Sequence, residues 1–262
     1  MAFVARTSSL ALATFLLSVS HARAQGGPPY FTNDPGTPGN RRWEINIGYI
    51  TIPETDQSTA HVPDLDINYG VGDRLQLTLE VAWLRHQLDS APPRYGLSQD
   101  TLGAKWRFYG DDTGLAVSVF PQASINNPTS SVARGVVPPG ASLTLPMEIS
   151  KTFDGLAVNG EIGYTLVQSA RAAWLAGIVA GHEKRIRHQK STVEFDVEFY
   201  AAGDVGGETE QKTLEGGVRV GIRPPFVLLL MAGWSLAHTQ ESITAYAGLQ
   251  LLLPARPFVS SR

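Results

Sequence analysis

The sequence predicts an all-β protein, namely an antiparallel up-and-down transmembrane β-barrel of about 12 strands. Three observations support this prediction. From Trp43 onward, apolar and polar residues alternate in successive segments, which is the pattern of strands with two different faces. Each segment is about 8 to 12 residues long, the length that a tilted strand needs to cross a bilayer. One face carries ionised residues in mid-strand, and the other face is strongly apolar.

Residues 1–24 are expected to form a signal peptide. Arg6 supplies a positive charge, Leu10 to Val19 form a short apolar run, and Ala22-Arg23-Ala24 is a small-residue cleavage site. The apolar run is about half of the roughly 20 residues that a spanning helix needs, which disfavours the alternative of an uncleaved anchor. Cleavage would remove two of the 21 basic residues and none of the 24 acids, so the net charge would move from -3 to -5.

Residues 25–42 form a Pro/Gly-rich segment ahead of the first strand. Proline and glycine recur so densely between Pro28 and Gly39 that neither helix nor sheet is predicted there. We expect a periplasmic lead-in that delivers the first strand to the membrane, with Arg41 and Arg42 near the lipid headgroups. The alternative is that this segment folds back into the barrel as a plug, although long prolyl segments are more often linkers.

The barrel itself is expected to span residues 43–253 and to contain an even number of strands, twelve in all. The residues 254–262 would form a C-terminal tail, in which Phe258 is the nearest aromatic residue to the end of the last strand. The predicted strands are Trp43–Thr51, Asp64–Val71, Arg74–His86, Ser98–Tyr109, Leu115–Ser124, Ala141–Thr152, Leu156–Val167, Ala172–His182, Thr192–Ala202, Lys212–Ile222, Phe226–Ala237 and Ser242–Leu253.

The connectors alternate between tight and long, as they do between the periplasmic and extracellular ends of outer-membrane barrels. The tight connectors contain the glycine, aspartate and proline that hairpin turns need, at Gly72-Asp73, Gly110–Gly114, Phe153–Gly155 and Arg223–Pro225. The long ones are predicted at Ile52–Pro63, Gln87–Leu97, Ile125–Gly140 and Gly203–Gln211. Three connectors break this rule: Gln168–Arg171 and His238–Glu241 are short, and Glu183–Ser191 is long and basic, so strand boundaries near 183–191 are uncertain.

The charged face of the predicted sheet would line the lumen of a membrane barrel. Ionised groups are costly in lipid, so mid-strand charges in such a barrel face a polar interior. In a secreted soluble sandwich the same pattern would be reversed, with charges facing water and apolar residues facing a core. The predicted lumen residues are Glu44, Asp64, Asp66, Arg74, Glu80, Lys105, Arg107, Glu148, Glu161, Glu194, Asp196, Glu198, Glu215 and Arg219.

Two features favour the membrane arrangement over the soluble one. The strands are longer than the five or six residues that are usual in soluble sheets. Aromatic residues gather towards strand ends, as the interface girdles of a membrane barrel require. The predicted girdle tryptophans are Trp43, Trp83, Trp106, Trp174 and Trp234.

Composition excludes several functional classes. The chain has no cysteine, so it can form neither disulfides nor thiolate metal sites. Its acidic balance argues against a nucleic-acid partner, which would require a basic face. A mean hydropathy of -0.06 is compatible with a membrane barrel, because alternating faces average out.

The N-terminal third resembles a known family. Trp43-Glu44-Ile45-Asn46, Asp66 to Gly70 and Gly72-Asp73-Arg74-Leu75 match the opening strands and turn of the outer-membrane transporters named after the meta-pathway of phenol degradation. The match covers about residues 27 to 110, and later hairpins share its rhythm only. The resemblance implies an outer-membrane barrel of a Gram-negative bacterium that moves small, aromatic or otherwise hydrophobic molecules. It also implies two partners, outer-membrane lipid and the barrel assembly machinery.

The leading functional hypothesis is passive, porin-like transport of a small solute through the lumen. Ten acids against four bases line the predicted lumen, and such a wall would disfavour anions. The alternative is a closed structural barrel with a salt-bridged lumen, because twelve strands lie between barrels filled by side chains and barrels with open channels.

An enzyme, such as an outer-membrane lipid hydrolase, is the less favoured alternative. His61, His86 and His238 fall at the elaborated end near Ser58 and Ser90, but no Gly-x-Ser-x-Gly motif surrounds them. We therefore predict no catalytic, cofactor-binding or metal-binding residues, since exposed histidines usually just meet water.

Overall fold

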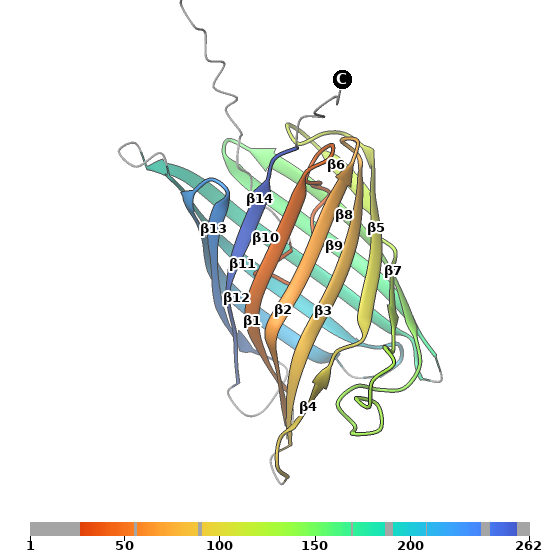
Figure 1. The fold of residues 1–262 in the computed structure, drawn as a ribbon. Coiled ribbons are helices and arrows are strands. Elements are labelled where there is room, and N and C mark those ends of the chain that lie inside the picture. Colours follow the sequence, from red (N-terminus) through yellow and green to blue (C-terminus); the bar gives the residue numbers. More distant parts are fainter. Residues whose placement is uncertain are drawn as a thin grey trace, which may run out of the picture.

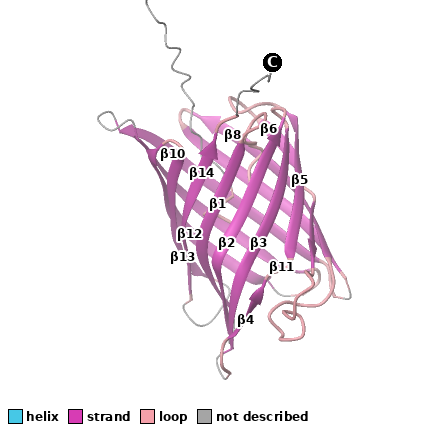
Figure 2. Ribbon diagram, in the orientation of Figure 1, coloured by secondary structure: helices cyan, strands magenta, loops and turns pink. Residues whose placement is uncertain are grey.

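The chain folds into one closed, antiparallel β-barrel with no helix in its described part (Figures 1 and 2). The computed structural model describes residues 27–54, 57–88, 91–168, 170–186, 191–207, 209–236 and 242–255. Its strands are β1 (Trp43–Glu54), β2 (Gln57–Val71), β3 (Leu75–Leu88), β4 (Arg94–Leu97), β5 (Asp100–Tyr109), β6 (Ala116–Val119), β7 (Gln122–Ile125), β8 (Ser142–Phe153), β9 (Leu156–Val167), β10 (Ala173–Ile186), β11 (Ser191–Asp204), β12 (Thr209–Arg223), β13 (Phe226–Ser235) and β14 (Ile243–Leu253).

Neighbouring strands in the sequence pair with one another around the whole barrel. β4 and β5 both pair with β3, and β6 and β7 each pair with β5 on one side and β8 on the other. Each of these two pairs therefore acts as a single strand of the barrel wall. The ring closes where β1 pairs with β14, with Trp43 opposite Leu253 and Ile47 opposite Leu249. The predicted fold class, an up-and-down barrel of twelve strands, is therefore confirmed.

Local chemistry explains why two strands of the barrel wall are each split in two: the predicted strand Leu115–Ser124 becomes β6 and β7, and β4 forms within the predicted connector Gln87–Leu97 ahead of β5. Between β6 and β7 lie Phe120 and Pro121, and proline has no N–H to donate to a neighbouring strand. Between β4 and β5, the ladder is interrupted at Ser98, whose side-chain hydroxyl accepts the N–H of Ala82 at 2.8 Å.

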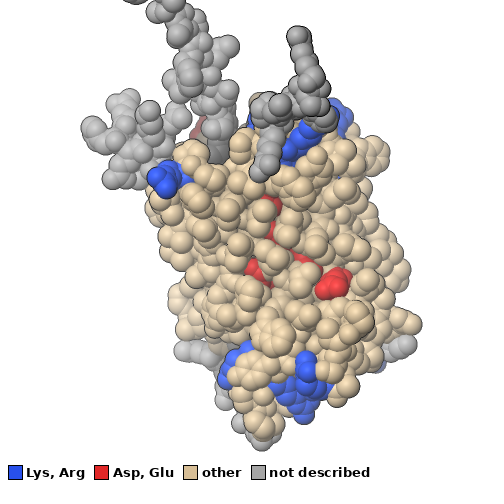
Figure 3. Space-filling model, in the orientation of Figure 1, with Lys and Arg blue, Asp and Glu red and all other residues tan. Residues whose placement is uncertain are grey.

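The apolar face points outward. Along β8, Leu145 and Met147 are 46% and 47% exposed, whereas Glu148 between the outward residues is completely buried. The middle of the barrel surface is mostly uncharged, with Lys and Arg gathered near its two ends and only a few acidic atoms showing at mid-height (Figure 3). A soluble sandwich would show the reverse arrangement, so the outward apolar belt selects the transmembrane barrel.

The predicted girdle tryptophans divide between the two ends of the barrel. Trp43 and Trp106 lie near the end with the tight turns, where the ring of Trp43 packs against Tyr69 with centroids 4.5 Å apart. Trp83, Trp174 and Trp234 lie near the opposite end of their strands. All are well exposed except Trp174, which is half-buried. Their placement at two levels suits aromatic girdles, and their role at the interface stays a prediction.

The elaborated end is built differently from the prediction. β1 and β2 extend to Glu54 and from Gln57, so most of the connector predicted at Ile52–Pro63 is a longer hairpin. The loops predicted at Gln87–Leu97 and Gly203–Gln211 are shortened in the same way by strand extension. Only the connector between β7 and β8, residues 126–141, is a long irregular loop among the described connectors. Strand also covers both flanks of the Glu183–Ser191 connector, up to Ile186 and from Ser191.

Within the residues that the structure describes, no helix is long and apolar enough to cross a membrane. The predicted signal peptide, the end of the C-terminal tail with Phe258, and Ser90 and His238 lie outside the described residues.

Candidate functional site

The barrel interior is lined by most of the residues that the sequence assigned to it. Asp64 and Glu80 are half-buried, and Arg74 is exposed at the turn between β2 and β3. The remaining eleven are buried: Glu44, Asp66, Lys105, Arg107, Glu148, Glu161, Glu194, Asp196, Glu198, Glu215 and Arg219. They come from seven barrel strands, and together they make the interior strongly polar.

The strand register places like charges directly opposite one another. Asp66 faces Glu80 between β2 and β3, Glu148 faces Glu161 between β8 and β9, and Glu198 faces Glu215 between β11 and β12. Like charges in such cross-strand pairs repel each other. Opposite charges do meet, at Glu194 and Arg219 in register and at Lys105 and Glu148, whose Nζ and Oε1 are 3.5 Å apart. The wall is therefore not a lattice of matched ion pairs.

A segment from the N-terminal side of β1 occupies part of this interior. Residues 27–36, which we call the plug, descend inside the barrel before the chain returns to its wall and enters β1 (Figure 1). The backbone N–H groups of Phe31 and Thr32 donate to the two carboxylate oxygens of Glu198, at 3.1 and 2.6 Å. Glu198 is fully buried midway along β11, so the tip of the plug reaches the middle of the barrel.

Two further wall residues bind the tip of the plug. The backbone N–H of Asn33 donates to Glu161 Oε2 at 2.7 Å, and its side-chain amide lies 3.4 Å from Oε1. The ammonium group of Lys105 donates to the backbone carbonyl of Asp34. Beyond the tip, Arg41 N–H donates to the carbonyl of Gly70 at 2.8 Å, which ties the chain back to the rim at the end of β2.

The start of the plug is held by β11 and β12. Arg219 Nη2 donates to the carbonyls of Gly27 and Pro28 at 3.0 and 3.2 Å, and its guanidinium lies 5.5 Å from the ring of Tyr30. Burial raises the pKa of the Tyr30 hydroxyl, with the Asp196 charge adding to the effect, so the phenol keeps its proton. It can then donate to the backbone carbonyl of Asp196, 3.4 Å away.

One wall glycine makes room for the plug. A Cβ atom on Gly177 of β10 would lie 1.9 Å from Thr32 Oγ1, far inside van der Waals contact. Thr32 itself is fully buried. Only glycine at this position lets the plug tip approach the wall so closely.

These contacts differ from the expected lead-in outside the barrel. Residues 27–36 lie within the lumen, as in the fold-back alternative. Hydrogen bonding explains why the segment lies inside the barrel. A Pro/Gly-rich segment has backbone N–H groups with no strand partner, and the buried wall carboxylates that it meets have no basic partner. Each group satisfies the other.

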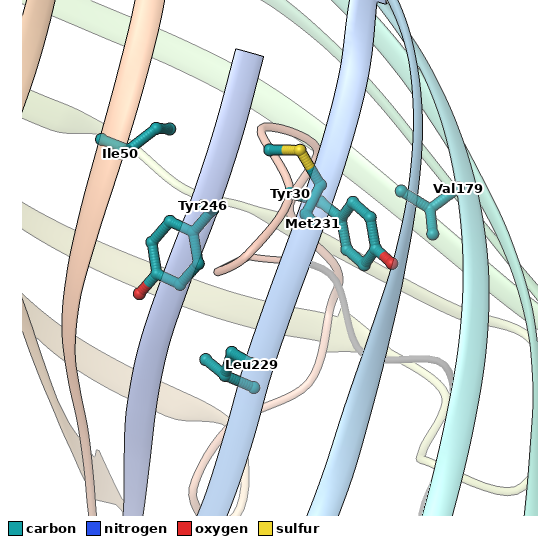
Figure 4. Packing of buried hydrophobic residues seen from close by; sticks show 6 residues of the cluster. All are labelled: Tyr30, Ile50, Val179, Leu229, Met231 and Tyr246. Atoms are coloured by element: carbon teal, nitrogen blue, oxygen red, sulfur yellow. The ribbon is translucent and has the colours of Figure 1, made fainter. Parts of the chain in front are cut away.

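An apolar patch interrupts the polar interior. It comprises Ile50 of β1, Val179 of β10, Leu229 and Met231 of β13 and Tyr246 of β14, and Tyr30 of the plug packs against it (Figure 4). Phe31, Ile52 and Val227 extend it. None of these residues is among the predicted lumen residues. A signal for them is present in the sequence, because β13 and β14 are apolar on parts of both faces.

Between the plug and the wall lies a cavity of about 340 Å³, which we call the chamber. Its polar lining includes Asp64, Asp66 and Glu80, and its apolar lining includes Phe31, Ile50 and Tyr246. Towards the elaborated end, the loop 126–141 folds against the inner side of β3, where Val136 and Val137 pack on Ala82 and Leu84.

The two catalytic-candidate histidines that the structure describes, His61 and His86, each contact a neighbouring polar side chain. His61 Nδ1 lies 3.1 Å from Asp64 Oδ1, and His86 Nδ1 lies 3.3 Å from Thr59 Oγ1. No group of three or more metal-ligating side chains suited to a metal ion is found in the part of the chain that the structure describes.

Comparison with known proteins identifies the fold. No family model and no curated protein matches the chain, so the resemblance to the phenol meta-pathway transporters is not confirmed. Among solved structures, a COG4313 outer-membrane channel from Pseudomonas putida F1 matches with a TM-score of 0.59 and 12% identity, over 87% of this chain and 100% of that one. This chain shares its fold. The KdgM porin in complex with oligogalacturonate matches with a TM-score of 0.50 and 12% identity, over 79% of this chain and 98% of that one.

Proposed function

We propose that the protein is a passive outer-membrane channel for small molecules and that the plug closes it in the conformation described here. Export by the N-terminal signal, insertion by the barrel assembly machinery and a surrounding of outer-membrane lipid belong to the same proposal. The observation that carries it is the lumen itself. The lumen is enclosed by the barrel wall, and its acidic residues outnumber its basic ones. The plug fills only part of it and is held by a small number of hydrogen bonds.

The cross-strand acid pairs favour a channel over a closed structural barrel. A lumen filled only for stability would be expected to match its charges, because like charges opposite one another cost stability. Three acid pairs face one another here, and one of them, Asp66 with Glu80, lines the chamber. Such departures from stable packing occur where a protein reserves space for a ligand.

The apolar patch bears on the class of solute. Leu229, Met231 and Tyr246 lie on adjacent strands and give the interior an apolar strip in addition to its acidic residues. Apolar lining with a few placed polar groups is the usual character of small-molecule sites. We therefore propose that the channel serves solutes with an apolar or aromatic body. The similarity to KdgM and to the COG4313 channel supports the barrel fold only. The proposed class of solute is inferred from the lining of the lumen.

Single-channel recording in planar bilayers tests the proposal. The full chain should give small or infrequent current steps, and deletion of residues 27–36 should give larger or more frequent ones. Heat-modifiable migration on a gel shows whether the deletion variant still forms a folded barrel. If the folded deletion variant passes no current and allows no solute-dependent swelling of liposomes, the channel is excluded and the closed structural barrel is favoured.

A further inference from the structure

The chamber has a strongly acidic lining. Six acids line it, namely Asp34, Glu44, Asp64, Asp66, Glu80 and Glu161, against one lysine and one histidine. Lys105 is already engaged, because its ammonium donates to the Asp34 carbonyl and lies 3.5 Å from Glu148 Oε1. Its one charge is therefore directed at the plug and at β8 rather than into the open volume.

Two of these acids are held side by side at the chamber wall. Asp66 and Glu80 are direct partners in the register of β2 and β3 and share the inward face. The side-chain amides of Asn46 and Asn68 donate to Asp66 at 2.9 to 3.0 Å and fix its carboxylate in place. Glu80 is half-buried, and its side chain makes no hydrogen bond or ion pair to any group of the described residues. Its carboxylate can therefore accept a donor that enters the chamber.

Another part of the chamber lining is apolar and aromatic. It is formed by Tyr30 and Phe31 of the plug, Ile50 and Ile52 of β1, and Tyr246 of β14. The side chains of Tyr30, Ile50 and Tyr246 lie together on the inner side of the barrel (Figure 4). A ligand that fits both parts of the lining must carry an apolar body and a separate group that donates hydrogen bonds or carries positive charge.

We propose that the chamber is a binding site for small organic cations, specifically primary ammonium compounds with an aromatic or aliphatic body. Glu80 and Asp66 receive the ammonium group, and the face formed by Phe31, Ile50 and Tyr246 receives the body. The volume of about 340 Å³ lies within the range of small-molecule pockets, roughly 300 to 1,000 Å³. The aromatic rings of Phe31 and Tyr246 add cation–π attraction for any ammonium that tilts towards them.

This inference deepens the proposed channel function, but the binding step is measurable without any current. The test uses three probes with the same phenylethyl body: phenethylamine, 2-phenylethanol and phenylacetate. Isothermal titration of the full chain in detergent should give the order amine, then alcohol, then acid. We expect the amine to bind about tenfold more tightly than the alcohol, since a hydrogen bond to a charged group is worth about one decade or more in affinity.

Two variants locate the site. Glu80→Gln should weaken phenethylamine about tenfold and leave 2-phenylethanol nearly unchanged, because the variant removes the charge and keeps the shape. Glu194→Gln is the matched control, since Glu194 is also a buried lumen acid but does not line the chamber. If Glu80→Gln fails the heat-modifiability test for folding, Asp66→Asn provides the same comparison at the paired residue.

The outcomes separate this inference from the channel function. Equal affinity for the three probes, or equal loss of the amine in Glu80→Gln and Glu194→Gln, overturns the ammonium site. Amine binding that depends on Glu80 in a chain whose plug-deleted variant conducts no current supports the site and rejects the channel. Current through the plug-deleted variant without probe discrimination supports the channel and rejects the site.

Discussion

The carboxylate of Glu198 should be the main latch of the plug. It accepts two backbone N–H groups, from Phe31 at 3.1 Å and Thr32 at 2.6 Å, inside a fully buried environment. Glu198→Gln keeps the size of the side chain, but one carboxylate oxygen becomes an NH₂ group that cannot accept. One plug amide therefore loses its partner, and the surviving bond loses the assistance of the charge.

The expected magnitude follows from these two bonds. A hydrogen bond to a charged group contributes about 1.5–3 kcal/mol, and a buried unpaired N–H adds a penalty of its own. A loss of about 2 kcal/mol shifts the equilibrium between docked and released plug by about 30-fold. In single-channel recordings, the open probability of Glu198→Gln should rise by that factor from a low starting value.

Glu194→Gln is the control for this measurement. It makes the same change on the same face of β11, and no hydrogen bond from the plug to Glu194 is observed among the described residues. Its open probability should rise much less than that of Glu198→Gln, because Glu194 faces Arg219 and affects the plug only through that residue. If Glu198→Gln gates like the unmodified chain while the deletion of 27–36 opens the channel, the two carboxylate bonds do not hold the plug and the reasoning is refuted.

Two further predictions follow from steric fit and from membrane depth. Gly177→Ala should displace the plug and raise the open probability, because its Cβ would meet Thr32 Oγ1 at 1.9 Å; Gly216→Ala, whose Cβ has no neighbour nearer than 3.9 Å, should not, and equal currents from the two variants would argue against the docked position. Met147→Arg, on the outward face of mid-β8, should lower the free energy of unfolding in lipid vesicles by about 2–4 kcal/mol, against about 0–1 for Leu156→Arg at a strand end, as urea titration would show; equal costs would contradict the assigned lipid-facing belt.

The strands were predictable because lipid-facing and lumen-facing residues alternate along each strand of a membrane barrel, which gives the sequence a period of two. Leu143, Leu145, Met147 and Ile149 alternate with residues of the other face, and this pattern fixes both the strand and its lipid-facing side. Strand ends were less predictable. Ile52 to Pro63 contains two prolines and many polar residues, which are typical of a loop. Beyond the apolar belt both faces of a strand meet polar surroundings, so β1 and β2 continue there without alternation.

The contents of the lumen could be predicted only in part. Which charged residues point inward follows from alternation, as Glu148 and Glu198 show. Which acids face each other depends on register, and the pairing of Asp66 with Glu80 is not encoded in either strand alone. The plug is harder still to foresee. Thr32 and Glu198 are 166 residues apart, and no local periodicity relates a Pro/Gly-rich segment to a carboxylate on a distant strand.

The position of the plug along the chain constrains how the molecule is assembled. The plug lies shortly before β1, and β1 pairs with β14, the last strand to be synthesised, so this seam can form only when the whole barrel sequence is present. Its hydrogen-bond acceptors, Glu161 and Glu198, belong to β9 and β11, which are synthesised much later. If β1 paired with β14 before the plug was inside, the plug would have to enter the lumen through the end of a closed barrel. This is avoided if residues 27–36 bind the inner face of the sheet while it is still open. Pairing of β1 with β14 would then close the barrel and enclose the plug in the same step.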